Sequence, residues 1–375
     1  MRRRMNRPDD RLLRRLIAEI AAEGPISVGA YMTRCLHDPL DGYYATRPAL
    51  GEAAAGGDFI TAPLISQVFG ELLGLWAADV WAQLGAPPRV ILAEMGPGDG
   101  TLMADVLRAG RAAPGFLDAA EVWLVETSAP LRRLQAARLG EDAARWAETL
   151  AELPEGVPLI LIANELLDCL PTDQFVRVGE RAWAERRVGL APDGQTPGRE
   201  SLAFGLVPLP PTFRPPAGHE AAPLGAVVEV SAAAAALGDA IARRIADGGG
   251  AALFIDYGEL TPVSGDTLQA LHRHRKEGAL DRPGVADLTV HADFKSLLAG
   301  LQNPTLAPPL TTTQAYFLTR LGLQIRVSDL AARHPEAADR LGRQRDRLIG
   351  ADQMGELFKV VCVCSKGLVP PGFEP

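Results

Sequence analysis

The sequence predicts an α/β protein whose core is a mainly parallel, doubly wound sheet. Short apolar runs, typical of buried strands, alternate with longer segments whose apolar residues recur at helical spacing. The buried strands are expected at 90–94, 121–126, 158–163 and 251–256. The helices between them are expected at 101–110, 129–139 and 230–247. This alternation favours parallel pairing, because each helix carries the chain back across the sheet.

The segments on either side of this pattern differ from it. Amphipathic helices are expected at 9–23 and 26–37, with Ser27 capping the second, followed by a long loop from His37 to Pro63. An apolar helix is expected at 64–84, and a final strand at 357–364 is expected to join the sheet late. Residues 174–207 alternate like strands around glycine turns and predict an antiparallel insertion.

These patterns divide the chain into four regions. A mainly helical N-terminal region covers 1–85, and an antiparallel β insertion covers 174–225. A second insertion with mixed patterning covers 259–312. The sheet core is expected to combine three segments, 86–173, 226–258 and 313–367.

Composition excludes several classes of protein. The 375 residues carry a formal net charge of −8, which argues against a nucleic-acid binder, and no apolar run reaches the roughly 18 residues of a membrane span. The basic N-terminus lacks the apolar segment of a secretory signal, so we expect a bacterial cytoplasmic protein, or a protein of the mitochondrial matrix if the chain is eukaryotic.

The four cysteines predict reduced thiols rather than a metal site, because no pair shows metal-ligand spacing. Cys362 and Cys364 lie in one apolar run and are expected on opposite faces of a strand. No other convincing set of metal ligands is present.

The loop Glu94-Met-Gly-Pro-Gly-Asp-Gly-Thr101 carries the clearest chemical signal. Gly96, Gly98 and Gly100 follow a buried strand and precede a helix, where glycines let backbone N–H groups approach a ligand. Their spacing is GxGxG, whereas a dinucleotide fingerprint is GxGxxG. Glu94 and Asp99 would repel a diphosphate, and they suit a ligand with a cationic amino group and a sulfonium. NAD is therefore disfavoured, and S-adenosylmethionine is the expected cofactor.

Two further strand ends carry polar side chains. Glu126 follows the next strand, where a carboxylate can accept both ribose hydroxyls of an adenosine, in either NAD or S-adenosylmethionine. Asn164, Glu165 and Asp168 follow a later strand and would face the transferred methyl group. The alternative for this segment is a helix start capped by Asn164, with acids in the first turn.

A set of motifs resembles the MidA family of class I methyltransferases, whose sheet is Rossmann-like. The resemblance runs from about residue 24 to about residue 366. The motifs are Gly24–Ser27, His37–Tyr44, Gly57–Pro63, Gln67–Gly70, Glu94–Met103, Asn164–Asp168, Ile255–Gly258, Asp287–Phe294 and Gly355–Lys359. The chain departs from the usual family pattern at Asp99 and Leu166.

The resemblance implies roles for particular residues. Glu94, the three loop glycines and Thr101 would surround the methionine half of the cofactor, and Glu126 would bind its ribose. Asp58, Phe59 and Thr61 would close over the cofactor as part of a lid. Ser128 and Asn164 are further candidates for the same site. The two insertions would build the substrate cleft.

The resemblance also implies the acceptor, because the family includes a mitochondrial complex I assembly factor that dimethylates an arginine on a core subunit. A protonated guanidinium needs carboxylates to orient it. Glu165, with Asp168 as its partner, is the expected catalytic pair. His291 and Asp293 are the alternative base pair, on one face of an extended segment.

Two other functions stay open at this stage. The chain could methylate another acceptor, because the cofactor loop does not report the nucleophile. It could also be a non-catalytic, cofactor-binding assembly factor. Apolar strands in the first insertion are compatible with a homodimer.

Overall fold

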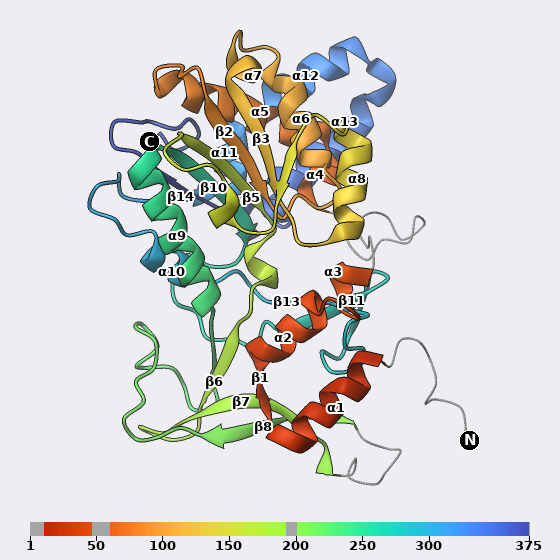
Figure 1. The fold of residues 1–375 in the computed structure, drawn as a ribbon, viewed down its shortest axis with the longest axis vertical. Helices are drawn as coiled ribbons and strands as arrows, with labels where there is room; N and C mark the ends of the chain where they lie inside the picture. The colour runs from red at the N-terminus through yellow and green to blue at the C-terminus, as the bar shows by residue number, and fades with distance from the viewer. Residues whose placement is uncertain (1–10, 47–60, 193–200, 375) are drawn as a thin grey trace.

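A seven-stranded sheet forms the upper part of the molecule in Figure 1, with the strand order β14-β15-β10-β5-β2-β3-β4. The computed structural model describes residues 11–46, 61–192 and 201–374. Five neighbouring strands are parallel: β2 (Val90–Met95), β3 (Ala120–Val125), β4 (Arg145–Ala147), β5 (Leu159–Asn164) and β10 (Gly250–Tyr257). The antiparallel strands β15 (Phe358–Cys364) and β14 (Leu310–Thr313) complete it. The predicted doubly wound sheet, with a late final strand, is confirmed.

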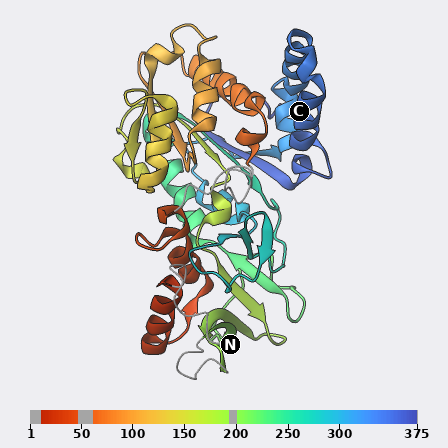
Figure 2. The same ribbon diagram turned by 90° about the vertical axis from the view of Figure 1, so that its right-hand side faces the viewer.

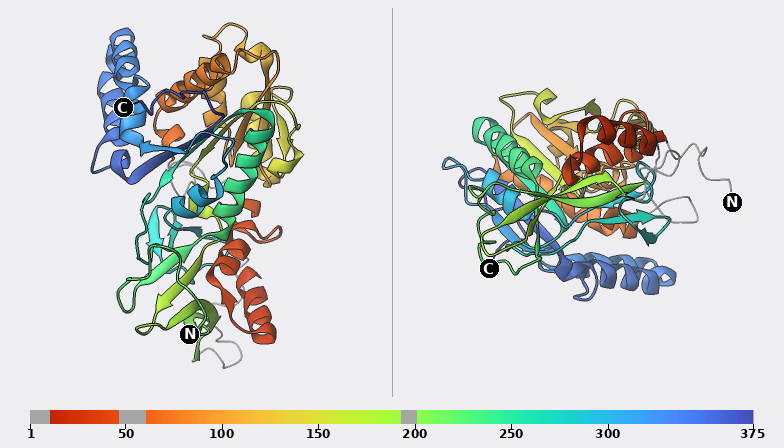
Figure 3. Two further views of the ribbon diagram at one scale, coloured as in Figure 1. Left: turned by 90° about the vertical axis from the view of Figure 1, so that its left-hand side faces the viewer. Right: turned by 90° about the horizontal axis from the view of Figure 1, so that it is seen from below.

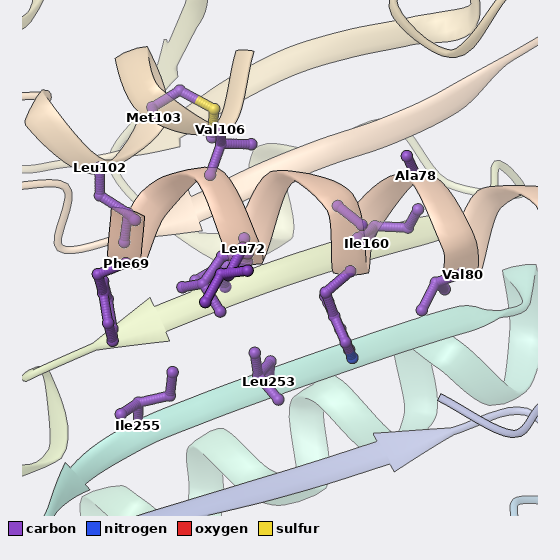
Figure 4. Close-up of a cluster of buried hydrophobic side chains, with 14 of the residues drawn as sticks. Phe69, Leu72, Ala78, Val80, Leu102, Met103, Val106, Ile160, Leu253 and Ile255 are labelled. Carbon is purple, nitrogen blue, oxygen red and sulfur yellow. The ribbon is translucent and has the colours of Figure 1, made fainter. Parts of the chain in front are cut away.

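Helices cover both faces of this sheet. Helices α5 (Gln67–Gln83) and α6 (Thr101–Gly110) pack on one face, and α9 (Ala232–Gly248) and α10 (Phe294–Gly300) pack on the other. Figure 4 shows the first layer, where side chains of α5 and α6 meet those of β5 and β10. The shorter helices α7 (Phe116–Ala119) and α8 (Ala129–Leu139) follow α6 and β3 in the chain.

Alternation along the buried strands produces these two layers. Ile160 and Ile162 of β5 belong to the cluster beneath α5, whereas Leu159 and Leu161 belong to the cluster beneath α9. The same rule corrects one expectation about the cysteines. Cys362 and Cys364 both join the α5 cluster, because residues two apart in a strand share a face. All four cysteines are buried and free.

The lower part of the molecule is a second, antiparallel sheet (Figures 1 and 2). Its strands are β1 (Ile26–Ser27), β6 (Asp173–Arg177), β7 (Trp183–Leu190), β8 (Leu202–Pro208) and β9 (Val227–Val230). The helices α1 (Arg11–Glu23) and α2 (Val28–His37) pack beside it. The left view of Figure 3 shows how these layers follow one another along the long axis. The predicted antiparallel insertion is confirmed, and β1 and β9 extend it.

A small sheet lies between the two larger ones. Its order is β12-β11-β13, and its strands are β11 (Gln269–His272), β12 (Arg275–Glu277) and β13 (Asp287–Thr289). Short 3₁₀ turns occur at η3 (Leu150–Glu152), η4 (Leu167–Cys169) and η6 (Pro335–Ala337). The turn η4 matters most for function, because it follows β5 directly.

Three local predictions need correction. The helix expected from residue 26 begins at Val28, because Ile26 and Ser27 pair with β7. The long loop after His37 contains a short helix, α3 (Tyr43–Thr46). The helix expected at 64–84 is divided into α4 (Ala62–Ile65) and α5. Ser66 divides it, because its backbone is extended and its side chain accepts the Val68 N–H.

The C-terminal helices were not predicted. Helices α11 (Gln314–Arg320), α12 (Leu323–Arg333), α13 (Ala338–Ile349) and α14 (Met354–Leu357) separate β14 from β15. Figure 2 shows α12 and α13 standing beside the sheet. Buried Glu71 of α5 anchors this unit, because it accepts from Arg326 of α12 at 2.7 Å and from Arg108 of α6 at 3.0 Å.

Two features bear on the predicted surroundings of the protein. Within the described ranges, no helix is both long and apolar enough to cross a bilayer. Strand β8 is a sheet edge, and Leu206 on it is 51% exposed. The homodimer stays a prediction.

We expect the α5 layer to dominate stability. Trp76 is fully buried there, so Trp76→Ala should lower the free energy of unfolding by about 3–5 kcal/mol. Leu75, its neighbour on α5, is 46% exposed, and Leu75→Ala should change it by less than about 1 kcal/mol. Urea denaturation followed by circular dichroism measures both, and equal losses would contradict this description of the core.

Candidate active site

A cavity of about 270 Å³ opens at the carboxyl ends of β2, β3 and β5. Ligands of open α/β sheets bind at this edge. The glycine loop after β2, residues of α2, α3 and α4, and the turn after β5 line the cavity. Its lining includes His37, Tyr44, Thr61, Glu94, Gly96, Gly98, Asp99, Thr101, Glu126, Thr127, Glu148, Asn164, Glu165, Leu166 and Cys169.

The glycine loop takes a backbone path that other residues adopt at a cost. Gly96, Gly98 and Gly100 have φ values of 65°, 53° and 82°. A Cβ on Gly96 would lie 3.0 Å from a side-chain carbon of Leu166, so the loop also packs closely on the turn after β5. Gly100 precedes α6 and brings the start of that helix to the cavity.

Asp99 has a structural partner. One of its carboxylate oxygens accepts the Thr101 N–H at 3.0 Å, and the other pairs with Arg138 at 2.6 Å. Arg138 therefore balances the charge of Asp99. The expectation that two loop acids select a cationic ligand consequently depends on Glu94.

Glu94 is buried and incompletely bonded. Its side chain is 3% exposed, and Oε2 has no hydrogen-bond partner among the described residues. Burial, reinforced by the nearby charges of Asp99 and Glu126, raises the pKa of Glu94 to about 8. Without a cation beside it, this carboxyl is mostly protonated at neutral pH.

A buried glutamine fixes Glu126 against the loop. Gln135 of α8 donates to Glu126 Oε2 at 3.2 Å and to the Gly98 carbonyl at 2.7 Å, and it accepts from Trp146 at 2.8 Å. The Ser128 N–H donates to Glu126 Oε1 at 2.7 Å. Burial raises the pKa of Glu126 despite these bonds. Sequence reasoning missed Gln135, because an isolated glutamine on a helix carries no pattern.

Ser128 and Thr101 hold different positions. Ser128 caps α8, and its hydroxyl donates to the Tyr44 carbonyl at 2.6 Å, so it ties α3 to the cavity without lining it. Thr101 lines the cavity, and its hydroxyl has no partner among the described residues. Thr61 also lines it, whereas Asp58 and Phe59 lie outside the described residues.

Glu165 projects from a tight turn after β5. Its φ is 51°, and its N–H donates to the Ile255 carbonyl at 2.8 Å. Oε1 accepts the Ala62 N–H and the Asn164 side-chain amide, both at 3.0 Å. Burial raises the pKa of Glu165 to about 7, opposed by the Ala62 bond and reinforced by the charge of Asp168.

Asp168 does not line the cavity. It accepts from the Tyr257 hydroxyl at 2.8 Å, and burial raises its pKa to about 6. The fully buried Asp256 lies beneath it, where Oδ2 accepts the N–H groups of Leu167 and Asp168 at 2.8 and 3.2 Å. Asp256 therefore holds the turn that presents Glu165.

His291 and Asp293 lie apart from Glu165. They line a second cavity, and His291 stacks edge-on against Tyr257. Asp293 caps α10 by accepting the Ser296 N–H, and it also accepts the Ser231 N–H. The described residues contain no group of three or more metal-ligating side chains.

Comparison with known proteins places the chain in a family. Residues 72–305 match the model described as "Putative S-adenosyl-L-methionine-dependent methyltransferase". Over 94% of this chain and 86% of the relative, the chain is 35% identical to "Protein arginine methyltransferase NDUFAF7, mitochondrial" of Danio rerio. The chain belongs to the MidA family of S-adenosylmethionine-dependent methyltransferases. The Homo sapiens protein of the same name is 33% identical, over 92% of this chain and 82% of the relative.

A solved MidA-like structure carries the product of the cofactor. A protein from Burkholderia thailandensis, bound to S-adenosyl-homocysteine, matches with a TM-score of 0.81 and 28% identity. The match covers 99% of this chain and 96% of that one. The fold is therefore that of S-adenosylmethionine-dependent methyltransferases, and S-adenosylmethionine is the cofactor of this MidA-family chain.

The cavity fits such a cofactor. Three buried polar atoms in its lining have no partner among the described residues: Glu94 Oε2, Thr101 Oγ1 and Asn164 Oδ1. A ligand with ammonium and hydroxyl groups can satisfy them. Apolar side chains of the lining can cover an adenine ring, namely Met95, Leu102, Val125 and Leu131.

We expect Asp256→Ala to loosen the turn after β5. Two buried N–H groups would lose their acceptor, which should lower the free energy of unfolding by about 2–4 kcal/mol. Asp256→Asn keeps a carbonyl oxygen at this place and should lose less than half as much. Chemical denaturation at neutral pH separates the two, and equal stability of both variants would show that Asp256 does not hold the turn.

Proposed function

We propose that this MidA-family protein transfers a methyl group from S-adenosylmethionine to an arginine side chain of a protein. The observation that carries the proposal is Glu165, a carboxylate at the acceptor end of the cavity whose raised pKa reflects a poorly solvated site. A guanidinium is always cationic and matches a carboxylate through paired N–H bonds. The relatives named protein arginine methyltransferases support the same acceptor.

The cofactor would lie along the glycine loop. Glu94 would accept the amino group of its methionine half, and Glu126 would accept hydroxyls of its ribose. The Gly98 N–H would face the ligand, whereas the N–H groups of Gly96 and Gly100 donate to the carbonyls of Val125 and Pro97 and hold the shape of the loop. The unpaired side-chain oxygens of Thr101 and Asn164 would form hydrogen bonds with the cofactor. When bound, S-adenosylmethionine supplies a methyl group on a positively charged sulfur.

Glu165 would hold the acceptor guanidinium at the other end. Its turn is fixed by the Ile255 carbonyl and Asp256, so the carboxylate can orient one nitrogen toward the methyl position. Pro63 and Leu64 line this end and would exclude water. Asp168 would act through the turn, because the Tyr257 hydroxyl occupies its carboxylate.

The acceptor protein we propose is a core subunit of a complex I-type respiratory enzyme. The support is the sequence resemblance to a family that includes a mitochondrial complex I assembly factor. Incubation of purified subunits with the protein and S-adenosylmethionine, followed by tandem mass spectrometry, tests both the residue and the partner. Methylation of a different residue type would replace arginine as the acceptor, and no methylation of any subunit would favour a non-catalytic assembly role.

Glu94 should make cofactor binding depend on pH. Between about pH 6 and about pH 7 its carboxyl loses a proton when a cation binds, so affinity for S-adenosylmethionine should rise by up to about tenfold. The side chain of the Glu94→Gln variant cannot ionise, so this variant should bind S-adenosylmethionine more weakly than the wild type, and its loss of affinity should grow as pH rises. Calorimetry at several pH values measures this loss of affinity. A loss of affinity that is the same at all pH values would show that Glu94 does not bind the ammonium group.

Glu165→Gln should separate turnover from cofactor binding. Loss of the carboxylate should lower kcat at least about 100-fold, because an amide cannot pair with the guanidinium charge. The dissociation constant for S-adenosylmethionine should change by less than about threefold. Glu336→Gln, a change at a surface acid, is the control. Full activity of the Glu165→Gln protein would refute this role.

A further inference from the structure

His37 lies on the wall of the same cavity that Glu165 lines. It is the last residue of α2, so it comes from the N-terminal helices rather than from the sheet. Its ring stacks on Tyr44 of α3, with centroids 5.7 Å apart and planes 29° apart. Cys169 and Leu166, from the turn after β5, line the cavity with it. The imidazole and the Glu165 carboxylate therefore line one cavity, and His37 is tied to the turn after β5 by a hydrogen bond to the Cys169 backbone.

The surrounding structure fixes the position of His37. Buried Tyr31, Cys35 and Leu36 anchor α2. The next residue, Asp38, is 3% exposed and pairs with Arg15 at 2.5 Å, and it accepts the Leu40 and Asp41 N–H groups. The backbone on both sides of His37 is thus held, while the ring is exposed to the cavity.

Desolvation leaves the His37 ring neutral at physiological pH. Burial by the atoms packed against the ring lowers the pKa of His37, opposed by a hydrogen bond to the Cys169 backbone. On its own helix, Arg34 pairs with Glu19. On the facing elements, burial raises the pKa of Tyr44 and of Cys169 well above the usual values, so both are uncharged.

Glu165 is the acid that the turn after β5 contributes to the cavity lining. The other acids in the cavity lining belong to the glycine loop or to later strand ends: Glu94, Asp99, Glu126 and Glu148. A carboxylate that pairs with a guanidinium must stay ionised to hold the guanidinium in place. A neutral imidazole does not form this ion pair, so it can accept a proton.

Methylation of an arginine releases one proton, and the reaction needs a group to take it. A guanidinium nitrogen forms a bond to the methyl carbon, the carbon–sulfur bond breaks, and its electron pair stays on sulfur. The nitrogen then carries one hydrogen too many. At that point the methylated group carries two positive charges, and loss of the proton returns it to the single charge of a methylated guanidinium.

We propose that His37 is a catalytic residue that accepts this proton on its imidazole ring and passes it to solvent. The inference rests on the proposed arginine methylation. His37 and Glu165 then divide the work, because Glu165 orients the guanidinium and His37 removes the proton. Exposure of the ring to the cavity gives the proton a way out.

The test uses His37→Gln and His37→Asn, each of which keeps an N–H donor near one of the two ring nitrogens. His334→Gln, on a histidine with a 61% exposed side chain, is the matched control. Calorimetry with S-adenosyl-homocysteine checks that the cofactor site is intact, and we expect dissociation constants within about threefold of the wild type. With a complex I core subunit as acceptor, kcat should fall about 100-fold in both His37 variants.

The pH profile distinguishes proton transfer from a structural role. In the wild type, kcat/KM for the acceptor should fall at acid pH with the square of the proton concentration, because Glu165 and His37 must both be deprotonated. In the His37 variants it should fall in simple proportion to the proton concentration. A second-power dependence retained in the His37 variants, or kcat within about twofold of wild type, would overturn the proposal.

A readout without turnover completes the test. Histidine side-chain NMR of the protein without ligand, assigned with the His37→Gln variant, should show His37 titrating below 6.5, the ordinary pKa of a histidine. A His37 that titrates at or above this ordinary value would overturn the proposal while leaving arginine methylation intact. A wild type that methylates another residue type would overturn both, whereas active wild type beside equally active His37 variants would overturn this inference alone.

Discussion

Glu165 adopts a left-handed backbone conformation immediately after the last residue of β5. This conformation costs a residue with a side chain about 1–2 kcal/mol, so the structure around it must hold it. The Ile255 carbonyl accepts its N–H, and Asp256 accepts the N–H groups of Leu167 and Asp168. Because Leu166 in the same turn packs on Gly96, the geometry of the glycine loop and of the acceptor end are linked.

The charges of the site follow from burial. Glu94, Glu165 and Asp168 all have raised pKa values, because the sheet edge and the surrounding helices remove water from their carboxyl groups. Between the unfolded pKa and each raised value, the folded state binds more protons than the unfolded state. The free energy of unfolding therefore falls as pH rises through this range. A cationic ligand beside these groups would offset the loss, and both the cofactor and a guanidinium are cationic.

The sequence predicted the parts of this arrangement that depend on local pattern. Alternation of strands with helices predicted the sheet, and strand ends brought Glu94, Glu126, Asn164 and Glu165 to one edge, where they line one cavity. Parallel strands that end side by side make such an inference safe. The glycine spacing predicted the ligand class. The second part of that argument used the charges of Glu94 and Asp99, and the structure pairs Asp99 with Arg138, which neutralises it.

The features that the sequence did not predict depend on contacts between distant segments. Gln135 carries no motif, and the His37–Tyr44 motif gave no role to His37; each gains its place from the element that packs beside it. Asp168 and His291 stand in suggestive motifs, yet Tyr257 lies against both of them away from the cavity. The helices α11 to α13 were missed because each buries only a few residues, and because α12 is held to the distant helix α5 by the Arg326–Glu71 ion pair.

A crystal structure of this protein with S-adenosyl-homocysteine tests the central claim most directly. The account predicts the amino group of the ligand at Glu94, its ribose hydroxyls at Glu126 and its sulfur facing the end of the cavity where Glu165 and His37 lie. A ligand whose sulfur faces away from Glu165, or which binds outside this cavity, would contradict the account.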